Sequence, residues 1–405
     1  MAIYALENAI QKYDWGDPDI LPVFLAKDNP HRDPWAELWI GTHPKAMSLA
    51  ITPGGARLPL DRVLDGGLTD GRPALPFMLK LLAVASPLSM QVHPSARKAV
   101  EGYQREQLAA IPLEAAERNY VDRNAKSEFV VALERFEGMC GFRPVDDILA
   151  TLRLVAGPHL KEYVGRFAAD PCRRELAVLF YTFISMSESR KTDILSKIRP
   201  RIDRLLQTER PGSPVARVLG WIPRLMDAFP GDMGALGPML LNTFELEPGQ
   251  GLAVPPGEPH AYFRGFALEA MASSDNEVRG GLTRKRVDMP EFIAALNFDT
   301  PPLQIQEPSR RKSGFRPYDA KSDDFTLAVM DLDGRYARAQ RRPGPELLLC
   351  VSGGLRLEGS GGDAVDLARG QAAFVSSDET GYSMTGAGTV FRALGGSRIR
   401  GVLTA

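Results

Sequence analysis

The chain has 405 residues, of which 44% are hydrophobic and 24% charged, and these values exclude a disordered or fibrous protein. Its length favours two or three domains rather than one hydrophobic core. The formal net charge of -1 provides no general attraction to nucleic acid or to an anionic membrane, so we expect neither as a partner.

Strand-like segments come first along the chain. Up to about residue 94, short apolar runs such as 38–40, 47–51 and 77–84 alternate with Gly, Pro and Asp, a rhythm typical of a β-sandwich or barrel. Residues 95–116 are rich in Ala, Glu, Lys, Arg and Gln and predict a helix. Strand character returns at 128–133.

From about residue 145 the apolar positions take helical spacing, with one stripe at Ile148, Leu152 and Val155. Residues 240–266 and 325–405 again predict short strands, because Gly and Pro punctuate them. We therefore expect a mainly β fold with a helical insertion: a jelly-roll catalytic core, an all-α domain and a C-terminal β-sandwich. The expected boundaries are 1–144 for the first part of the core, 145–232 for the helical domain, 233–320 for the second part of the core and 321–405 for the C-terminal β domain.

The chain has only five histidines, and His93 lies in a short strand-like segment of mixed polarity. Alternation along a strand places Ser89, Gln91 and His93 on one face, with the side chains between them on the other. Gln91 and His93 can therefore present an amide oxygen and an imidazole nitrogen to one ion. Considered alone, such a pair is more often a structural histidine beside a surface glutamine, because two-residue spacing is common.

Two further segments add ligand types that suit the same ion. Alternation brings Lys126 to the same face as Glu128, although such a pair is often only a solvated ion pair. A Pro-rich turn leads into His260, with Tyr262 on the same face. Together with Gln91 and His93, Glu128 and His260 would form a mixed nitrogen and oxygen site compatible with zinc.

A dense polar run follows His260 and ends in several cations. It contains Asp275 and Asn276, followed by Arg279, Arg284 and Lys285. Arginine grips phosphate through two hydrogen bonds, so the run suits an anionic substrate. A solvated basic turn is the other interpretation of the same charges.

Several separate motifs, in the same order, resemble those of type I mannose-6-phosphate isomerases, which are zinc enzymes with a bicupin fold. The matching segments extend over nearly the whole chain and occupy residues 11–16, 36–45, 76–80, 88–94 and 259–285. Two departures are Ser127 and Arg284, which stand where the family usually has proline. They alter loop stiffness without removing a functional side chain.

The resemblance implies an isomerase that interconverts mannose 6-phosphate and fructose 6-phosphate with one Zn²⁺ per chain. The implied zinc ligands are Gln91, His93, Glu128 and His260. The implied catalytic residues are Lys80, Lys126, Glu269, Asp275 and Arg279, and those implied for substrate or phosphate are Ser89, Tyr262, Asn276, Arg279 and Lys285. His43 lies in a matching motif but is expected to be structural, and no metal is expected in the C-terminal β domain because no histidine follows His260.

Isomerisation of this kind moves a proton between C2 and C1 through an enediol, and Glu269 is our first candidate for the proton carrier, before Lys126 or Lys80. Two rival interpretations remain at this point. A cupin oxygenase would use iron or manganese on two histidines and one carboxylate, and a non-catalytic bicupin would bind a sugar phosphate as a sensor.

The expected surroundings of the protein follow from its cysteines and its N-terminus. Three scattered cysteines, Cys140, Cys172 and Cys350, favour a reducing compartment. The first residues lack a basic stretch followed by an apolar run, and no segment approaches the length of a membrane span. We expect a cytoplasmic monomer without a membrane partner.

Overall fold

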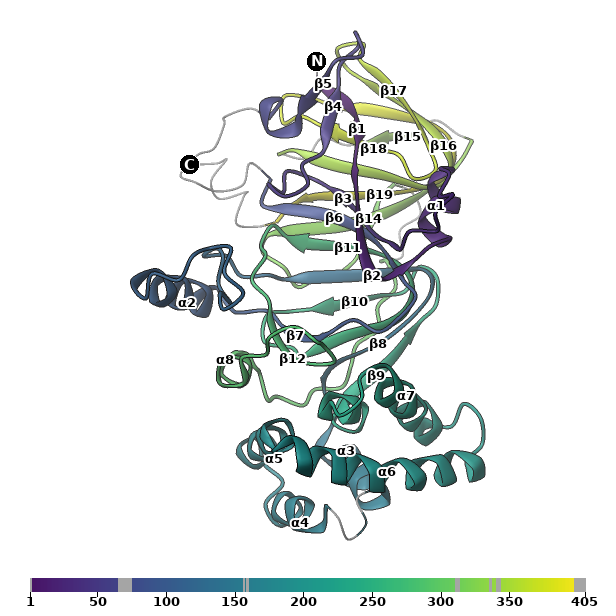
Figure 1. Cartoon of the computed structure of the whole chain (residues 1–405). Helices are drawn as coiled ribbons and strands as arrows, with labels where there is room; N and C mark the ends of the chain where they lie inside the picture. Colours follow the sequence, from purple (N-terminus) through teal and green to yellow (C-terminus); the bar gives the residue numbers. More distant parts are fainter. Residues whose placement is uncertain are drawn as a thin grey trace.

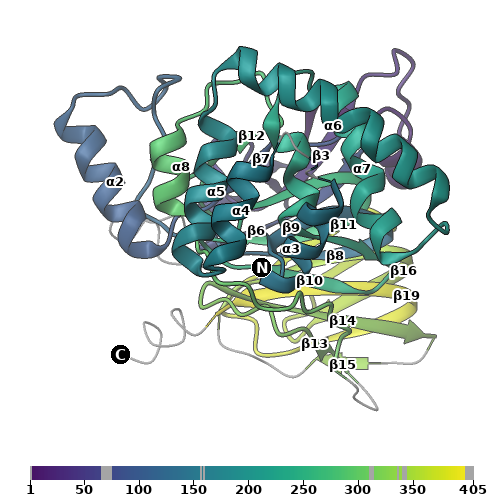
Figure 2. The same ribbon diagram turned by 90° about the horizontal axis from the view of Figure 1, so that it is seen from below.

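The computed structural model describes residues 2–64, 75–155, 157, 160–309, 314–334, 337–339 and 344–396. Three parts follow one another along the molecule: a β unit formed mainly by C-terminal strands, a central β unit, and a group of helices (Figure 1). Seen from below, these helices cover one end of the central unit (Figure 2). The predicted mainly β fold with a helical insertion is confirmed.

The central unit is an antiparallel sheet. Its main strands, in spatial order, are β10 (Gly251–Val254), β8 (Glu128–Phe142), β11 (His260–Ala272), β6 (Phe77–Val84), β2 (Ala9–Asp17) and β3 (Trp35–Ile40). Three short strands complete it: β7 (Met90–Val92), which pairs with β11 and with β12 (Val278–Gly281), and β9 (Leu241–Leu246), which pairs with β8. Strand β7 thus lies between the start of β11 and strand β12, which belongs to the polar run after β11.

The second sheet contains the C-terminal strands together with three from the first 60 residues. Its order is β13 (Arg316–Pro317), β14 (Phe325–Asp333), β19 (Tyr382–Gly395), β16 (Glu346–Gly359), β18 (Ala372–Val375), β1 (Ile3–Glu7), β4 (Leu49–Ile51) and β5 (Arg57–Pro59). Two more strands, β15 (Ala337–Ala339) and β17 (Ala364–Ala368), pair with β19 and β16.

Strand β1 pairs with a strand from the far end of the chain. Ile3 pairs with Val375 and Leu6 with Ala372, although residues 1–144 are predicted to belong to the catalytic core. Pairing between strands so far apart in sequence depends on tertiary packing and has no local signature. The division of the chain into four domains stays a prediction.

The side chains of the central sheet alternate between two environments. On β6, Leu79 and Leu81 pack into the core between the two sheets, whereas Leu82 packs on the opposite, inner face. Lys80 shares this inner face because it lies two residues before Leu82. Its partner in the register of β11 is Glu269. The twofold period of a strand therefore places charged side chains inside the curled sheet.

Five helices, joined by short non-helical connections, occupy most of the described residues from 145 to 228, as the helical spacing predicted. They are α3 (Val145–Val155), α4 (Lys161–Ala169), α5 (Arg173–Ser185), α6 (Glu188–Thr208) and α7 (Pro214–Ala228). The predicted stripe of Ile148, Leu152 and Val155 is fully buried. It belongs to one core cluster with Met90 and Val92 of β7, so the helices share a continuous hydrophobic core with the strand that bears Gln91.

The other helices of the described residues are α1 (Ile20–Leu25), η1 (Leu60–Arg62), α2 (Ala96–Leu108), η3 (Met233–Met239) and α8 (Met289–Ala295). Helix α2 ends earlier than the predicted 95–116, since Ala110 adopts a left-handed conformation with φ of 54°. Pro112 also disfavours helical backbone at the residue before it. Among the described residues, none of the helices combines the length and apolarity that crossing a bilayer requires.

Candidate metal centre

Four side chains from three strand ends meet inside the central sheet. Gln91 is the middle residue of β7 and His93 follows that strand, while Glu128 begins β8 and His260 begins β11. The register pairs His260 with Gln91, which brings residues far apart in sequence side by side. Met90 and Val92 are fully buried on the opposite face of β7, as the alternation predicted.

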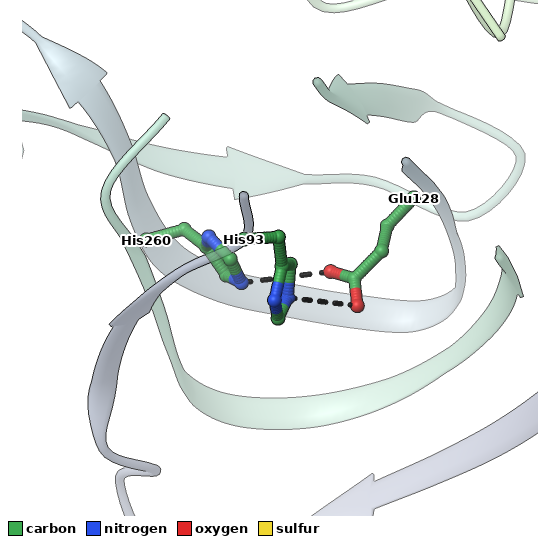
Figure 3. A group of neighbouring side chains, drawn as sticks. All are labelled: His93, Glu128 and His260. Atoms are coloured by element: carbon green, nitrogen blue, oxygen red, sulfur yellow. Dashed lines mark ion pairs between the residues drawn. The ribbon is translucent and has the colours of Figure 1, made fainter. Parts of the chain in front are cut away.

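The distances within this cluster are short, and its members are almost inaccessible to solvent. Nε2 of His93 lies 3.0 Å from Oε1 of Glu128, and Nε2 of His260 lies 3.5 Å from Oε2 of the same carboxylate (Figure 3). The Gln91 amide is 3.3 Å from Nε2 of His260. Both histidines are 1% exposed and Glu128 is 2% exposed. The atoms facing one another are therefore sealed from water.

The hydrogen bonds on the outer side of each ring define its tautomer. Nδ1 of His93 lies 2.9 Å from the backbone oxygen of Asn276, and Nδ1 of His260 lies 3.0 Å from that of Glu258. A carbonyl only accepts, so each Nδ1 atom carries a proton, and in a neutral ring the Nε2 atom then presents a lone pair. Burial, together with His93, lowers the pKa of His260 to about 4, which keeps its ring neutral at pH 7.

When both rings are neutral, as metal binding requires, two imidazole lone pairs and a carboxylate face one another. Nε2 of His93 and Oε2 of Glu128 are buried and have no hydrogen-bond partner. Such an arrangement is repulsive unless a cation lies at its centre. Within the described residues, these three are the one group of His, Cys, Asp or Glu side chains close enough to share a metal ion. The mixed nitrogen and oxygen set fits zinc.

Lys126 and Glu128 form the charged edge of this cluster. Nζ of Lys126 lies 3.1 Å from Oε1 of Glu128, and both residues are buried. Burial raises the pKa of Glu128, but His93 and Lys126 more than offset this effect, so its pKa lies well below the ordinary value. Ser127, between them, makes a 2.7 Å hydrogen bond with Ser322, which ties this loop to the C-terminal part of the chain.

Glu269 and Tyr262 lie on the inner face of β11. The Tyr262 hydroxyl donates to Oε1 of Glu269 at 3.1 Å, and both side chains are buried. Burial, with the charge of Glu128, raises the pKa of Glu269 to about 8 although Lys80 and Lys126 oppose this. A carboxyl group with a pKa near neutrality can both take and return a proton. The catalytic role of Glu269 stays a prediction.

Lys80 lies across from Glu269 in the neighbouring strand. Its Nζ is 3.5 Å from Glu37 and 4.6 Å from the centre of the Trp39 ring. Both contacts come from β3, whose residues belong to the second matching motif. The structure therefore brings Lys80, Lys126 and Glu269 to the inner side of one sheet.

The predicted phosphate-binding residues lie around β7 and β12. Arg279 is opposite Gln91 in the register, and its guanidinium forms a 2.6 Å ion pair with Glu277. Ser89 is half-buried just before β7, whereas Lys285 and Arg284 are exposed. The backbone N–H of Lys285 donates to the Thr283 hydroxyl at 3.1 Å. This hydrogen bond holds the backbone of Lys285 and does not involve its ammonium group.

Asp275 and Asn276 are held within the protein. Asp275 lies 3.0 Å from Nε2 of His43 and 2.7 Å from Nζ of Lys45; burial raises its pKa, but these two partners lower it below its ordinary range. Asn276 is fully buried, and its amide nitrogen donates to the backbone oxygens of Asp122 and Asn124. Contacts of Asp275 and Asn276 with substrate stay predictions. The structure adds that Asn276 supports His93 through its backbone oxygen.

Sequence reasoning missed Glu277, whose carboxylate lies beside the Gln91 amide. The available signal was the alternation that places Glu277 and Arg279 on one side of β12. Of the two histidines not yet placed, His31 is exposed, and His159 lies outside the described residues.

Comparisons with known proteins agree with this geometry. Residues 3–145 match the family profile described as phosphomannose isomerase type I, catalytic domain. The chain is 33% identical to mannose-6-phosphate isomerase of Escherichia coli over 96% of its own length and 98% of that protein. It is 29% identical to the Homo sapiens mannose-6-phosphate isomerase, with 82% of each chain covered.

Solved structures give the same result. A crystal structure of mannose 6-phosphate isomerase from Salmonella typhimurium, described as bound to substrate and to a zinc atom, aligns with a TM-score of 0.87 at 32% identity. The alignment covers 98% of this chain and 100% of that one. With this full-length similarity and the cluster at Gln91, His93, Glu128 and His260, the chain belongs to the mannose-6-phosphate isomerase family.

Proposed function

We propose that this protein is an aldose–ketose isomerase that interconverts mannose 6-phosphate and fructose 6-phosphate and uses one zinc ion. The observation that supports this most strongly is the buried convergence of two imidazole lone pairs and the Glu128 carboxylate in a chain related over its whole length to such isomerases. Gln91, His93, Glu128 and His260 would hold the metal. When bound there, zinc supplies Lewis acidity toward the oxygens of an open-chain sugar.

Glu269 is the residue best suited to move the proton. Isomerisation transfers one proton from C2 to C1 and shifts another between the two oxygens, so it consumes no oxidant or reductant. A carboxylate whose pKa is raised to about 8 is basic enough to accept a carbon-bound proton and acidic enough to return it. Tyr262 holds its carboxylate through a 3.1 Å hydrogen bond, which restricts its orientation.

Lys80 and Lys126 contribute positive charge on the same inner face. Both are buried, and both lower the pKa of Glu269 against the effect of burial. An enediolate carries negative charge on the sugar oxygens, and fixed cations in a water-poor site stabilise such charge strongly. Lys126 is also oriented by its contact with Glu128 at 3.1 Å.

Arg279 and Lys285 are the proposed partners of the substrate phosphate. The net charge of -1 provides no long-range attraction for a dianion, so local cations must supply the selectivity. Arg279 is partly buried and held by Glu277, while Lys285 is exposed in the loop after β12. Ser89 precedes the metal-binding strand and is the proposed hydroxyl donor on that side.

The isomerase reaction can be tested together with metal content. We expect purified protein to contain about one zinc per chain and to convert mannose 6-phosphate to fructose 6-phosphate in a coupled assay. Glu269→Gln should retain zinc and lose turnover by about 10²-fold or more. Glu137→Gln, which alters a buried carboxylate paired with Arg264 in the same sheet, should retain both and serves as the control.

Other outcomes of the same assay identify the rival functions. Iron or manganese in place of zinc, with no isomerase activity, would favour an oxygenase. Substrate binding without turnover in the wild-type protein would favour a sugar-phosphate sensor. A cytoplasmic location stays a prediction, supported by the three dispersed cysteines, all of which are free thiols. A monomeric state also stays a prediction.

A further inference from the structure

The side-chain amide of Gln91 has two orientations that differ in which atom faces the cluster. In one, its nitrogen donates to Oε1 and Oε2 of Glu277 at 3.1 and 2.9 Å, and its oxygen faces Nε2 of His260 at 3.3 Å. In the other, its oxygen opposes the Glu277 carboxylate, although its nitrogen can then donate to the neutral Nε2 of His260 at 3.3 Å. Hydrogen bonds to a carboxylate are about twice as strong as neutral ones, so the first orientation is favoured.

This choice matters because an amide binds a metal ion through its oxygen. The orientation selected by Glu277 directs that oxygen toward His260, and hence toward the space that His260 shares with His93 and Glu128. The reverse orientation would direct N–H groups there, and these repel a cation. The oxygen and the NH₂ group of the Gln91 amide are similar in shape, so a hydrogen-bond partner is needed to determine which of them faces the metal.

Each of the other three ligands already has an orienting partner. Backbone oxygens of Asn276 and Glu258 hold the His93 and His260 rings, at 2.9 and 3.0 Å, and Lys126 holds Glu128. Outer partners of this kind typically change metal affinity by about 10–100-fold when they are removed.

We propose that Glu277 is a positioning residue that keeps the Gln91 amide oxygen turned toward the metal, an inference that rests on the proposed function. Glu277 touches neither the metal nor the substrate in this role. Its ion pair with Arg279, at 2.6 Å, links the metal ligand Gln91 to the proposed phosphate-binding cation. The register supports the link, because β12 places Arg279 directly opposite Gln91.

Zinc affinity is the direct measure of this role. Metal-free protein would be titrated with zinc in competition with a chromophoric chelator, which gives a dissociation constant independent of turnover. Glu277→Leu removes the acceptor while keeping a side chain of similar size, and we expect it to weaken zinc binding by about 10–100-fold. Glu277→Gln can still accept through its amide oxygen and should show a smaller loss. Glu137→Gln, which alters another carboxylate paired with arginine, should bind zinc as the wild type does.

A second substitution separates positioning from a general structural effect. The two oxygens of a carboxylate are equivalent, so Gln91→Glu removes the need for orientation. In the wild-type background this change opposes two carboxylates and should weaken zinc binding, whereas in the Glu277→Leu background it should recover most of the lost affinity. The sign of the effect of Gln91→Glu therefore reverses between the two backgrounds.

Three results overturn the proposal. Wild-type zinc affinity in Glu277→Leu would show that Gln91 needs no such partner. A weakened Glu277→Leu that Gln91→Glu fails to recover would assign the loss to the fold instead, as would a large fall in the melting temperature of its metal-free form. If the wild-type protein binds no zinc at all, the proposed function itself fails, and that outcome is distinct from a zinc-binding protein whose Glu277 variant is unaffected.

Discussion

Replacing His260 by alanine removes one of the two imidazole lone pairs at the candidate metal centre. Its Nε2 lies 3.5 Å from Glu128 and 3.3 Å from the Gln91 amide, and the residue is 1% exposed. Burial limits the water that can reach the vacated position. We therefore expect His260→Ala to lose metal and activity together.

The size of the loss follows from the number of ligands. Zinc binding to four protein ligands is worth about 10–16 kcal/mol at pH 7 in small zinc domains. An even share for one ligand is about 2.5–4 kcal/mol, which corresponds to a fall in affinity of roughly 10²–10³-fold. Water that enters the space left by the imidazole would move the result toward the lower end of this range.

Two measurements examine this expectation. The dissociation constant of zinc would be obtained by chelator competition, and the melting temperature would be compared with and without zinc, since a ligand that binds only the folded state raises it. Zinc should stabilise the wild type and have little effect on His260→Ala. His43→Ala, which alters another buried histidine that pairs with Asp275 instead, should keep its zinc. Wild-type affinity in His260→Ala would refute the assigned ligand set.

The remaining predictions concern substrate, pH and stability. Arg279→Ala should keep its zinc while turnover of mannose 6-phosphate falls by about 10²-fold or more. Arg284→Pro, at an exposed position in the loop after β12, should leave turnover nearly intact. Loss of zinc from Arg279→Ala would contradict a role in phosphate binding alone. The Glu269 pKa is about 8 in the folded protein against an ordinary value of 4.5, so the metal-free wild type should lose stability as pH rises from about 4.5 to 8, at up to roughly 1.4 kcal/mol per unit. Glu269→Gln has no carboxyl group to titrate and should lack this loss. The free energies of unfolding in urea should therefore differ more between the two proteins at pH 8.5 than at pH 5, and an equal difference at both pH values would count against a raised pKa. Asp232→Ala removes the acceptor of the backbone N–H groups of Gly234 and Leu282, at 2.7 and 2.6 Å, and should lower the free energy of unfolding by about 1–3 kcal/mol, with Asp232→Asn less affected.

Much of the local structure could be predicted from neighbouring residues. The helical period at Ile148, Leu152 and Val155 predicted both the helix and its buried face, and the strand period predicted that Gln91 and His93 share one side of β7. These patterns are visible in sequence because each depends on residues only two to four positions apart. The end of helix α2 was missed, although Pro112 beside the left-handed Ala110 was its local signal.

Other features depended on contacts between distant segments. The pairing of β1 with β18, and of Gln91 with His260, follows from the closure of whole sheets, and one strand alone does not specify its partner. The raised pKa of Glu269 likewise needs burial and the nearby charge of Glu128, which no spacing encodes.

The sequence by itself determined which side chains could serve the chemistry, since the ligand types, the cations and their faces are local properties of the strands that bear them. The tertiary structure decided how those side chains are presented. Carbonyls from Asn276 and Glu258 select the tautomers of His93 and His260, and Glu277 selects the orientation of the Gln91 amide. The contacts of Asn276 with His93 and of Glu277 with Gln91 join groups far apart in sequence, so they exist only when the folded sheet brings a donor to an acceptor at bonding distance, whereas Glu258 lies two residues from His260.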